Sequence, residues 1–317
     1  MSQPANIRIV IAICTAGRLQ GLHECLTSVA AITVPEGASV QLLVIDNDPQ
    51  QRATAMLAET VPHYPLVLTS CSELRRGICY ARMKAVDYFL EAGADFLAFI
   101  DDDETVCKEW LVELMRVQHV TAADIVTGPA YEYFEAEHKV PHWISQMQLF
   151  SPRSRLSAMA CSMAYTHNIL IARRVLEALH PAFDLTFNTS GGEDEFFSMR
   201  AIKAGFQIVW CEEAKVASAF PPERATLRWV LRRGYRVGSS WSVGVRLLYA
   251  RKVAWPRLAL FVVLRGGRAL RALLKGVLLC NRTHLADGAF YTAQTIGTIA
   301  GAFGLQYGEY APKECIA

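Results

Sequence analysis

The sequence predicts an α/β fold built on a mostly parallel sheet. Short apolar, β-branched segments alternate with segments whose apolar residues recur at helical spacing, over about the first 240 of 317 residues. Strands that alternate with helices imply right-handed crossovers and therefore parallel strands. Several predicted strands also end in polar residues, at the edge of the sheet where ligands of such folds bind.

The predicted elements follow one another in a regular order. Strands are expected over residues 7–14, 40–45, 66–68, 96–100 and 168–172, with an interrupted strand over 125–134. Helices are expected over residues 18–29, 51–59, 77–86, 109–115 and 193–204. Residues 135–155 are polar and mixed, and we expect a loop that is mobile or faces the substrate. His138 and His142 lie there at helical spacing, but the intervening Pro141 argues against a metal-binding helix.

A run of acids follows the fourth predicted strand. Residues 96–100 are apolar, and Asp101, Asp102, Asp103 and Glu104 come directly after them. Adjacent carboxylates repel one another, and a divalent cation is the usual compensation at the end of a buried strand. The same acids would also suit the first turn of a helix, where they complement the helix dipole. This segment alone leaves both interpretations open.

Two further predicted strands end in polar residues. Thr15 follows the first strand and Asp46 ends the second, so both are expected beside the acids. The glycine fingerprint of dinucleotide-binding sheets is absent after the first strand, and so is a Walker loop. The charge of a bound phosphate must then be met by a metal ion and by cationic side chains.

A second group of acids opens the predicted helix at residue 193. Glu193, Asp194 and Glu195 follow two glycines there. Complementation of the helix dipole explains one or two of these acids. A carboxylate near a metal-diphosphate site is also a natural general base.

Composition narrows the classes of function. The formal net charge is +2, so no global field points to nucleic acid. The nine cysteines have no zinc-site spacing, and an odd number suits a reducing compartment. The N-terminus lacks the basic and apolar regions of a signal peptide, so we expect a cytoplasmic protein.

Six short motifs occur in an order and at spacings that are specific in combination. They lie at residues 10–15, 44–48, 77–82, 99–103, 192–196 and 229–238. Together they resemble glycosyltransferase family 2, inverting enzymes of the GT-A fold that use nucleotide sugars, and in particular bacterial exopolysaccharide enzymes of the succinoglycan glucosyltransferase type. The resemblance covers residues 7–240. It implies a Rossmann-like, mixed but mostly parallel sheet flanked by helices.

The resemblance also implies how the donor, a UDP-sugar, is held. Asp46 would accept a hydrogen bond from the uracil ring, and Arg82 would face the uridine or the diphosphate. Arg232 or Arg233 would clamp the diphosphate in a closed state. The residues expected to bind the nucleotide sugar are Thr15, Arg18, Asp46, Arg82, Asp101, Asp102, Arg232 and Arg233.

The metal and the catalytic base follow from the same resemblance. Asp103, with Asp101, would hold Mn²⁺ or Mg²⁺ at the diphosphate. Asp194 would deprotonate the acceptor hydroxyl, and Glu193 would orient the acceptor. Many relatives carry a further metal-binding histidine before a proline pair, but residues 215–222 contain none. Ser218 or water would then complete the metal shell.

Residues 241–317 form a second predicted region after the transferase domain of residues 1–240. Apolar stretches there are bordered by basic residues that recur at helical spacing, namely Arg265, Arg268, Arg271 and Lys275. No run reaches the ~20 apolar residues that span a bilayer, so we expect a basic amphipathic helix lying on the membrane. A helical hairpin packed on the catalytic domain, with its arginines merely solvated, is the alternative.

The amphipathic helix implies a peripheral protein on the cytoplasmic face of the inner membrane. Its acceptor would be a lipid-linked saccharide or an oligosaccharide. The small residues of 288–307 suggest a further packed helix that permits homo-oligomers. Two other functions compete with sugar transfer: a nucleotidyltransferase, and a noncatalytic membrane-bound sugar-binding or scaffold protein. The first lacks the expected phosphate loop, and the second has no use for Asp194 as a base.

Overall fold

The computed structural model describes residues 7–134, 140–150 and 155–308. The chain forms two compact units. The first comprises Met1–Tyr131, Pro152–Asn188 and Glu193–Ser218. The second comprises Glu132–Ser151, Thr189–Gly192 and Ala219–Ala317.

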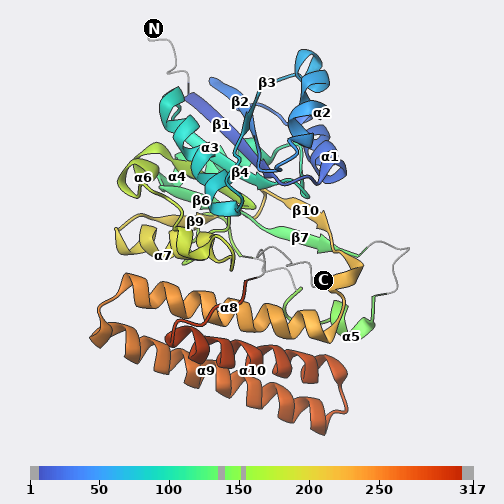
Figure 1. The fold of residues 1–317 in the computed structure, drawn as a ribbon, viewed down its shortest axis with the longest axis vertical. Coiled ribbons are helices and arrows are strands. Elements are labelled where there is room, and N and C mark those ends of the chain that lie inside the picture. The colour runs from blue at the N-terminus through green and yellow to red at the C-terminus, as the bar shows by residue number, and fades with distance from the viewer. Residues whose placement is uncertain (1–6, 135–139, 151–154, 309–317) are drawn as a thin grey trace. The chain divides into compact units, whose positions relative to one another are not determined.

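A seven-stranded sheet forms the centre of the first unit (Figure 1). Its strands are β1 (Ile7–Thr15), β2 (Ala38–Asp46), β3 (Val67–Ser72), β4 (Phe96–Asp101), β6 (Ile125–Thr127), β8 (Asn168–Ala172) and β9 (Ile208–Trp210). Their order is β3-β2-β1-β4-β8-β6-β9. Every neighbouring pair is parallel except those of β8, which runs antiparallel to β4 and to β6. The sheet is mixed but mostly parallel, as predicted.

Helices cover both faces of this sheet. They are α1 (Leu19–Ala30), α2 (Arg52–Thr60), α3 (Ile78–Ala92), α4 (Trp110–Thr121), α6 (Arg173–Ala178) and α7 (Glu193–Lys203), with short 3-10 helices η1 (Val61–His63) and η2 (Leu185–Phe187). α1, α2 and α4 share a core with Ile9, Ile11 and Ile13 of β1. The alternating residues Val10 and Ala12 are also buried and point to the opposite face. Burial on both faces explains why β1 reads as a continuous apolar run.

The acids of residues 101–104 do not open a helix. Asp101 ends β4, and the short strand β5 (Thr105–Val106) follows the acids directly. α4 begins only at Trp110. β5 belongs to a three-stranded sheet of order β5-β10-β7, with β7 (Ala130–Tyr133) and β10 (Val216–Ala219). The helix-start interpretation of the acid run is therefore wrong.

Three long helices make up most of the second unit. They are α8 (Leu227–Leu248), α9 (Arg251–Leu278) and α10 (Arg282–Ala302), accompanied by α5 (His142–Ser145) and η3 (Pro222–Arg224). α10 packs along both α8 and α9 (Figure 1). The predicted domain boundary at residue 240 falls inside α8, which is one continuous helix. The division into domains at that residue stays a prediction.

Glycines let the backbones of α8 and α10 approach closely. A Cβ atom at Gly238 would lie 2.0 Å from the carbonyl oxygen of Gln294, and one at Gly297 would lie 2.0 Å from that of Tyr235. Only hydrogen fits at these positions. The small residues of α10 thus serve packing within the chain, and they require no second copy to explain them.

Among the helices that the structure describes, none combines the length and the hydrophobicity that a bilayer span requires. α9 nevertheless exposes many large apolar side chains alongside its basic residues. The exposed ones are Val253, Trp255, Leu260, Val263, Leu264, Leu270, Leu274, Val277 and Leu278. A helix with exposed apolar and basic residues is the pattern expected for the C-terminal region.

Candidate active site

The polar ends of neighbouring strands meet at one edge of the sheet. Thr15 of β1 is paired with Asp46 of β2, and Cys14 of β1 is paired with Asp101 of β4. These parallel strands bring together side chains that are far apart in the chain, as the sequence predicts. The site is therefore built on strand ends, which are rigidly held by the sheet.

Arg18 neutralises two of the three consecutive aspartates. Its guanidinium forms an ion pair with the buried carboxylate of Asp102 and a second one, of 2.7 Å, with Asp103. Burial raises the pKa of Asp102 to about 6, although Arg18 and the Thr15 hydroxyl both lower it. Asp103 is 40% exposed, whereas Asp102 is fully buried. Asp103 can therefore reach a ligand, and Asp102 holds Arg18 in place.

Arg82 connects the acid run to the second group of acids. Its guanidinium donates to Glu193 at the start of α7 and, at 3.1 Å, to Asp101 at the end of β4. Arg82 and Glu193 are both almost fully buried, and Asp101 is 37% exposed. Burial opposes the charge on Arg82, but Glu193, Asp101 and Asp194 outweigh it and raise the pKa of the guanidinium. Arg82 is thus permanently charged and held between the two groups of acids.

Asp46 and Asn47 shape the loops beside the site. The fully buried carboxylate of Asp46 accepts hydrogen bonds from the backbone N–H groups of Asp48 and Thr54 and from the Thr54 hydroxyl. Asn47 accepts from the N–H of Gly77, where α3 begins. The contact predicted between Asp46 and a nucleobase stays a prediction.

His167 belongs to the site and is missing from the residues chosen from sequence. It directly precedes β8, whose Asn168 is paired with Ile100 of β4. The Nδ1 atom of His167 lies 3.2 Å from the Oε1 atom of Glu104. Burial alone would lower the pKa of His167, but the carboxylates of Glu104, Asp101 and Asp194 raise it to about 9. The only sequence signal was a histidine directly before a predicted buried strand, which is weak because the partner strand is unknown.

Asp194 is one of two partly exposed acids of the second group, together with Glu195. It lies in the first turn of α7, and its carboxylate accepts a hydrogen bond of 2.7 Å from the N–H of Glu195. Its charge acts on both Arg82 and His167. The structure therefore brings Asp194 into the same electrostatic site as the acid run. Glu193, by contrast, is buried against Arg82 and faces no solvent.

The exposed acids have the chemistry of a divalent metal site. Asp101 and Asp103 offer carboxylate oxygens, the ligands that Mg²⁺ and Mn²⁺ prefer. A second cluster of possible ligands, Glu113, Cys211 and Glu213, fits such a metal less well. Arg116 already pairs with both glutamates, and burial raises the pKa of the Cys211 thiol to about 12. Asp101 and Asp103 are thus the better candidates among the described residues.

The remaining predicted site residues are placed as follows. Arg232 and Arg233 lie on α8 in the second unit. Ser218 lies on β10, which pairs with β5 directly after the acid run. His142 begins the single turn α5, and His138 lies outside the described residues.

Comparison with known proteins identifies the family to which the chain is similar. The family model of glycosyl transferase family 2 matches residues 10–179, and that of glycosyl transferase family group 2 matches residues 96–304. The chain is 33% identical over 311 residues to the succinoglycan biosynthesis protein ExoM of Rhizobium meliloti (strain 1021), covering 96% of each chain.

Two solved structures share the fold. The mannosyltransferase PcManGT from Pyrobaculum calidifontis, in complex with GDP-Man and Mn²⁺, has a TM-score of 0.61 at 17% identity. That match covers 93% of this chain and 87% of the other. TarS residues 1–349 from S. aureus, in complex with UDP-GlcNAc, have a TM-score of 0.51 at 13% identity, covering 95% and 93% of the two chains.

Proposed function

The chain belongs to glycosyl transferase family 2 and has the GT-A fold, and on that premise we propose that it is an inverting hexosyltransferase of surface polysaccharide synthesis. Its donor is a UDP-sugar, and its acceptor is a lipid-linked saccharide. Membership of a glycosyltransferase family leaves no support for a nucleotidyltransferase or a noncatalytic scaffold. The relative named for succinoglycan biosynthesis, which matches over almost the whole chain, supports the polysaccharide.

One observation carries the proposal for the reaction. Arg82 binds Asp101 at the end of β4 and Glu193 at the start of α7. The acids suited to a metal diphosphate and the acid suited to deprotonate an acceptor therefore border a single site. That is the arrangement a direct displacement needs, with the donor and the acceptor held together.

We assign the metal to Asp103 and Asp101. Both carboxylates are partly exposed, and each forms an ion pair with an arginine, Asp103 with Arg18 and Asp101 with Arg82. A cation is therefore favoured beside each of them. When bound, a divalent cation would neutralise the charge of the departing UDP. Arg18 stays on Asp102 in that state, since its ion pair with the buried carboxylate does not depend on Asp103. Thr15, Asp46, Arg232 and Arg233 complete the proposed nucleotide-sugar set.

Asp194 is proposed as the general base. Its carboxylate takes the proton of the acceptor hydroxyl while the acceptor oxygen bonds to the anomeric carbon of the donor. The bond from that carbon to the UDP oxygen breaks, and UDP leaves with the electron pair. Attack from the face opposite to UDP inverts the configuration. Glu193 acts by holding Arg82, because it is buried in that ion pair.

Measurement of UDP release from UDP-hexoses tests the base. Asp194→Asn should lose at least about 100-fold in transfer rate with the true acceptor, since general-base catalysis contributes typically 10²–10⁴-fold. The melting temperature should stay close to that of the wild type, because Asp194 is partly exposed. Asp87→Asn, which removes a carboxylate of an exposed pair with His180, is the matched control. Full transfer activity in Asp194→Asn would reject this assignment.

We also propose that α9 holds the protein at the cytoplasmic face of the inner membrane. Its exposed leucines and valines are interspersed with Arg265, Arg268 and Arg271. An anionic membrane would bury the apolar side chains and attract the arginines to its lipid head groups. A lipid-linked acceptor would be available at that surface. Flotation with anionic liposomes should be lost in Arg265→Glu/Arg268→Glu/Arg271→Glu. Unchanged flotation of this variant would contradict the electrostatic part of the proposal.

A further inference from the structure

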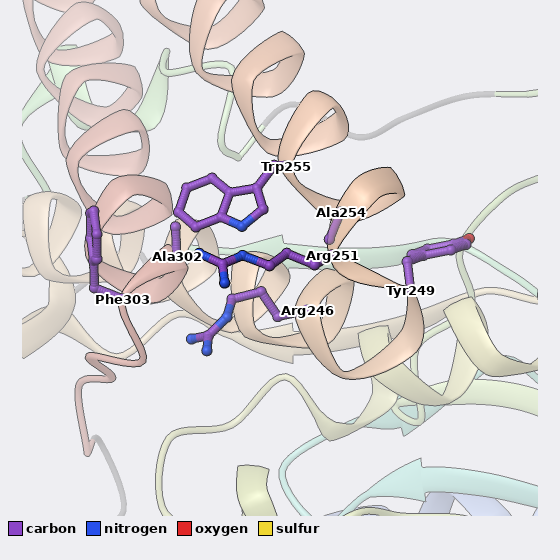
Figure 2. Close-up of a pocket in the computed structure, with 7 residues that line it drawn as sticks. All are labelled: Arg246, Tyr249, Arg251, Ala254, Trp255, Ala302 and Phe303. Carbon is purple, nitrogen blue, oxygen red and sulfur yellow. The ribbon is translucent and has the colours of Figure 1, made fainter.

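A pocket of about 490 Å³ lies in the second unit, where the end of α8, the start of α9 and the end of α10 meet (Figure 2). Figure 2 shows the side chains of Arg246 and Arg251 extending in the same direction, toward the side of the pocket on which Trp255 and Phe303 lie, whereas Tyr249 points away from them. The pocket therefore places two guanidinium groups beside a pair of aromatic rings.

The positive charge in this pocket is not compensated by the described part of the chain. Arg246 donates a hydrogen bond of 3.3 Å to the carbonyl oxygen of Gly301, which is neutral. Arg251 is exposed and has no hydrogen bond or ion pair to any residue that the structure describes. Its position adds to the deficit, because α9 begins at Arg251 with neither an acid in its first turn nor a side-chain cap. A cation at the N-terminus of a helix is repelled by the positive end of the helix dipole. A bound anion would offset both this repulsion and the uncompensated charge of the two arginines.

Few acids in the second unit could supply that anion. Residues 219–308 contain fourteen arginines and lysines but only two acids, Glu223 and Asp287, and the other described segments of this unit add only Glu132, which does not line the pocket. Asp287 is buried, and its carboxylate accepts a hydrogen bond from the backbone N–H of Gln148. Glu223 lies on η3, outside the residues that line the pocket. The anion that this pocket suits therefore comes from outside the described chain.

Two large aromatic side chains line the pocket beside the two charges. Trp255 and Phe303 meet edge to face, with 6.1 Å between ring centroids, and Phe303 is 72% exposed. Further large apolar side chains next to the pocket residues in sequence are also exposed, namely Leu247, Val253, Ile299 and Leu305. Tryptophan beside arginine is typical of surfaces that are apolar on one side and wet on the other. We refer to these six exposed apolar side chains as the apolar collar. A simple inorganic anion would make no contact with them.

We propose that this pocket binds the phosphate head group of a membrane amphiphile, whose hydrocarbon chain lies over the exposed apolar collar. A guanidinium presents two parallel N–H donors that match two phosphate oxygens, so Arg246 and Arg251 would share the head group. The proposal rests on the membrane association proposed above and adds a specific lipid site to it. An anionic phospholipid and a polyprenyl phosphate both carry this chemistry.

Two double variants with the same loss of charge test the site. Arg246→Gln/Arg251→Gln removes the charges of the pocket, and Arg228→Gln/Arg282→Gln removes two exposed arginines of the same unit outside it. Trp255→Ala removes one aromatic wall. Each protein is titrated with short-chain phosphatidic acid below its micelle concentration and with inorganic phosphate. Each is also floated with phosphatidylcholine vesicles that carry either phosphatidylglycerol or a polyprenyl phosphate.

We expect the wild type and the control to bind the short-chain lipid about tenfold tighter than inorganic phosphate, and the pocket variant to lose about tenfold or more. Trp255→Ala should weaken the lipid but not inorganic phosphate. The vesicle that floats the control but not the pocket variant identifies the source of the phosphate. Equal losses in the two double variants would overturn the proposal, because they would indicate only a diffuse positive field.

The membrane proposal can stand or fall separately. Suppose that the pocket variant still binds vesicles and that the wild type does not bind the short-chain lipid. This result would overturn the proposed lipid site in the pocket and leave the proposed role of α9 intact. A wild type that binds neither lipid nor vesicles would overturn both. All substituted residues are exposed, and circular dichroism and the melting temperature verify that each variant is folded.

Discussion

Arg82 of α3 and Glu193 of α7 form an ion pair in which both side chains are almost fully buried. The pair joins residues 111 positions apart in the chain. Arg82 also binds Asp101, so the ion pair positions the acid run of β4 relative to the helix that carries Asp194. Stability and activity should therefore both depend on this pair.

Glu193→Gln should destabilise the protein by about 3–5 kcal/mol, because it leaves Arg82 charged and only partly paired in a buried place. Urea denaturation measures the loss. Glu177→Gln breaks the exposed pair with Arg173 and should cost less than about 1 kcal/mol. Similar losses in the free energy of unfolding for the two variants would show that the buried ion pair contributes no more to stability than the exposed one.

Asp103→Asn should abolish the stabilisation by Mn²⁺ and UDP together while leaving the ligand-free melting temperature almost unchanged, since a bound ligand stabilises by mass action. Asp102→Asn should preserve the shift caused by the ligands, because Asp102 is buried against Arg18 rather than open to a ligand. Thermal unfolding with and without Mn²⁺ and UDP distinguishes the two. A full Mn²⁺ response in Asp103→Asn would remove this residue from the metal site.

Stability should fall as pH rises from about 6.5 to about 9 through His167. The folded protein holds the His167 proton up to about pH 9, because Glu104, Asp101 and Asp194 surround the ring, whereas the unfolded chain releases it near 6.5. The contribution is therefore complete below pH 6.5 and lost above 9, and it amounts to roughly 3 kcal/mol at most. His167→Gln should flatten this part of the urea stability profile. Identical slopes of stability against pH in the two proteins would show that these carboxylates do not keep His167 protonated in the folded state.

Gly77→Ala should destabilise the start of α3 for two reasons. Gly77 has φ of 130°, and a Cβ there would lie 2.1 Å from the Oδ1 atom of Asn188. Asn188 is itself held by the N–H of Cys79, so it cannot simply move away. Gly37→Ala is the control, because its φ is also positive, at 73°, but nothing lies within 4 Å of the added carbon. We expect the Gly77 variant to lose more in urea denaturation than the control, by about 1–3 kcal/mol. Equal losses would mean that the contact with Asn188 costs nothing.

The sequence by itself determined most of the strands and helices of the first unit and the edge of the sheet on which the site lies, but not the strands β5, β9 and β10. Apolar runs ending at Thr15, Asp46 and Asp101 are local patterns, and parallel strands necessarily bring their carboxyl ends together. The start of α7 at Glu193 and the basic, apolar character of α9 are local patterns too. Such features depend on residues within one or two turns of each other, so periodicity and composition reveal them.

Only the tertiary structure decided how the charges are paired. β8 inserts antiparallel beside β4, and this places His167 against Glu104. The consecutive acids Asp102 and Asp103 differ in exposure because one side chain faces the interior with Arg18 and the other faces solvent. Gly297 and Gly301 of α10 pack against α8, and Gly288 packs against α9, a use that composition alone does not distinguish from self-association. Each of these outcomes depends on which distant segment becomes the neighbour, and burial and charge pairing follow from that neighbour rather than from local sequence.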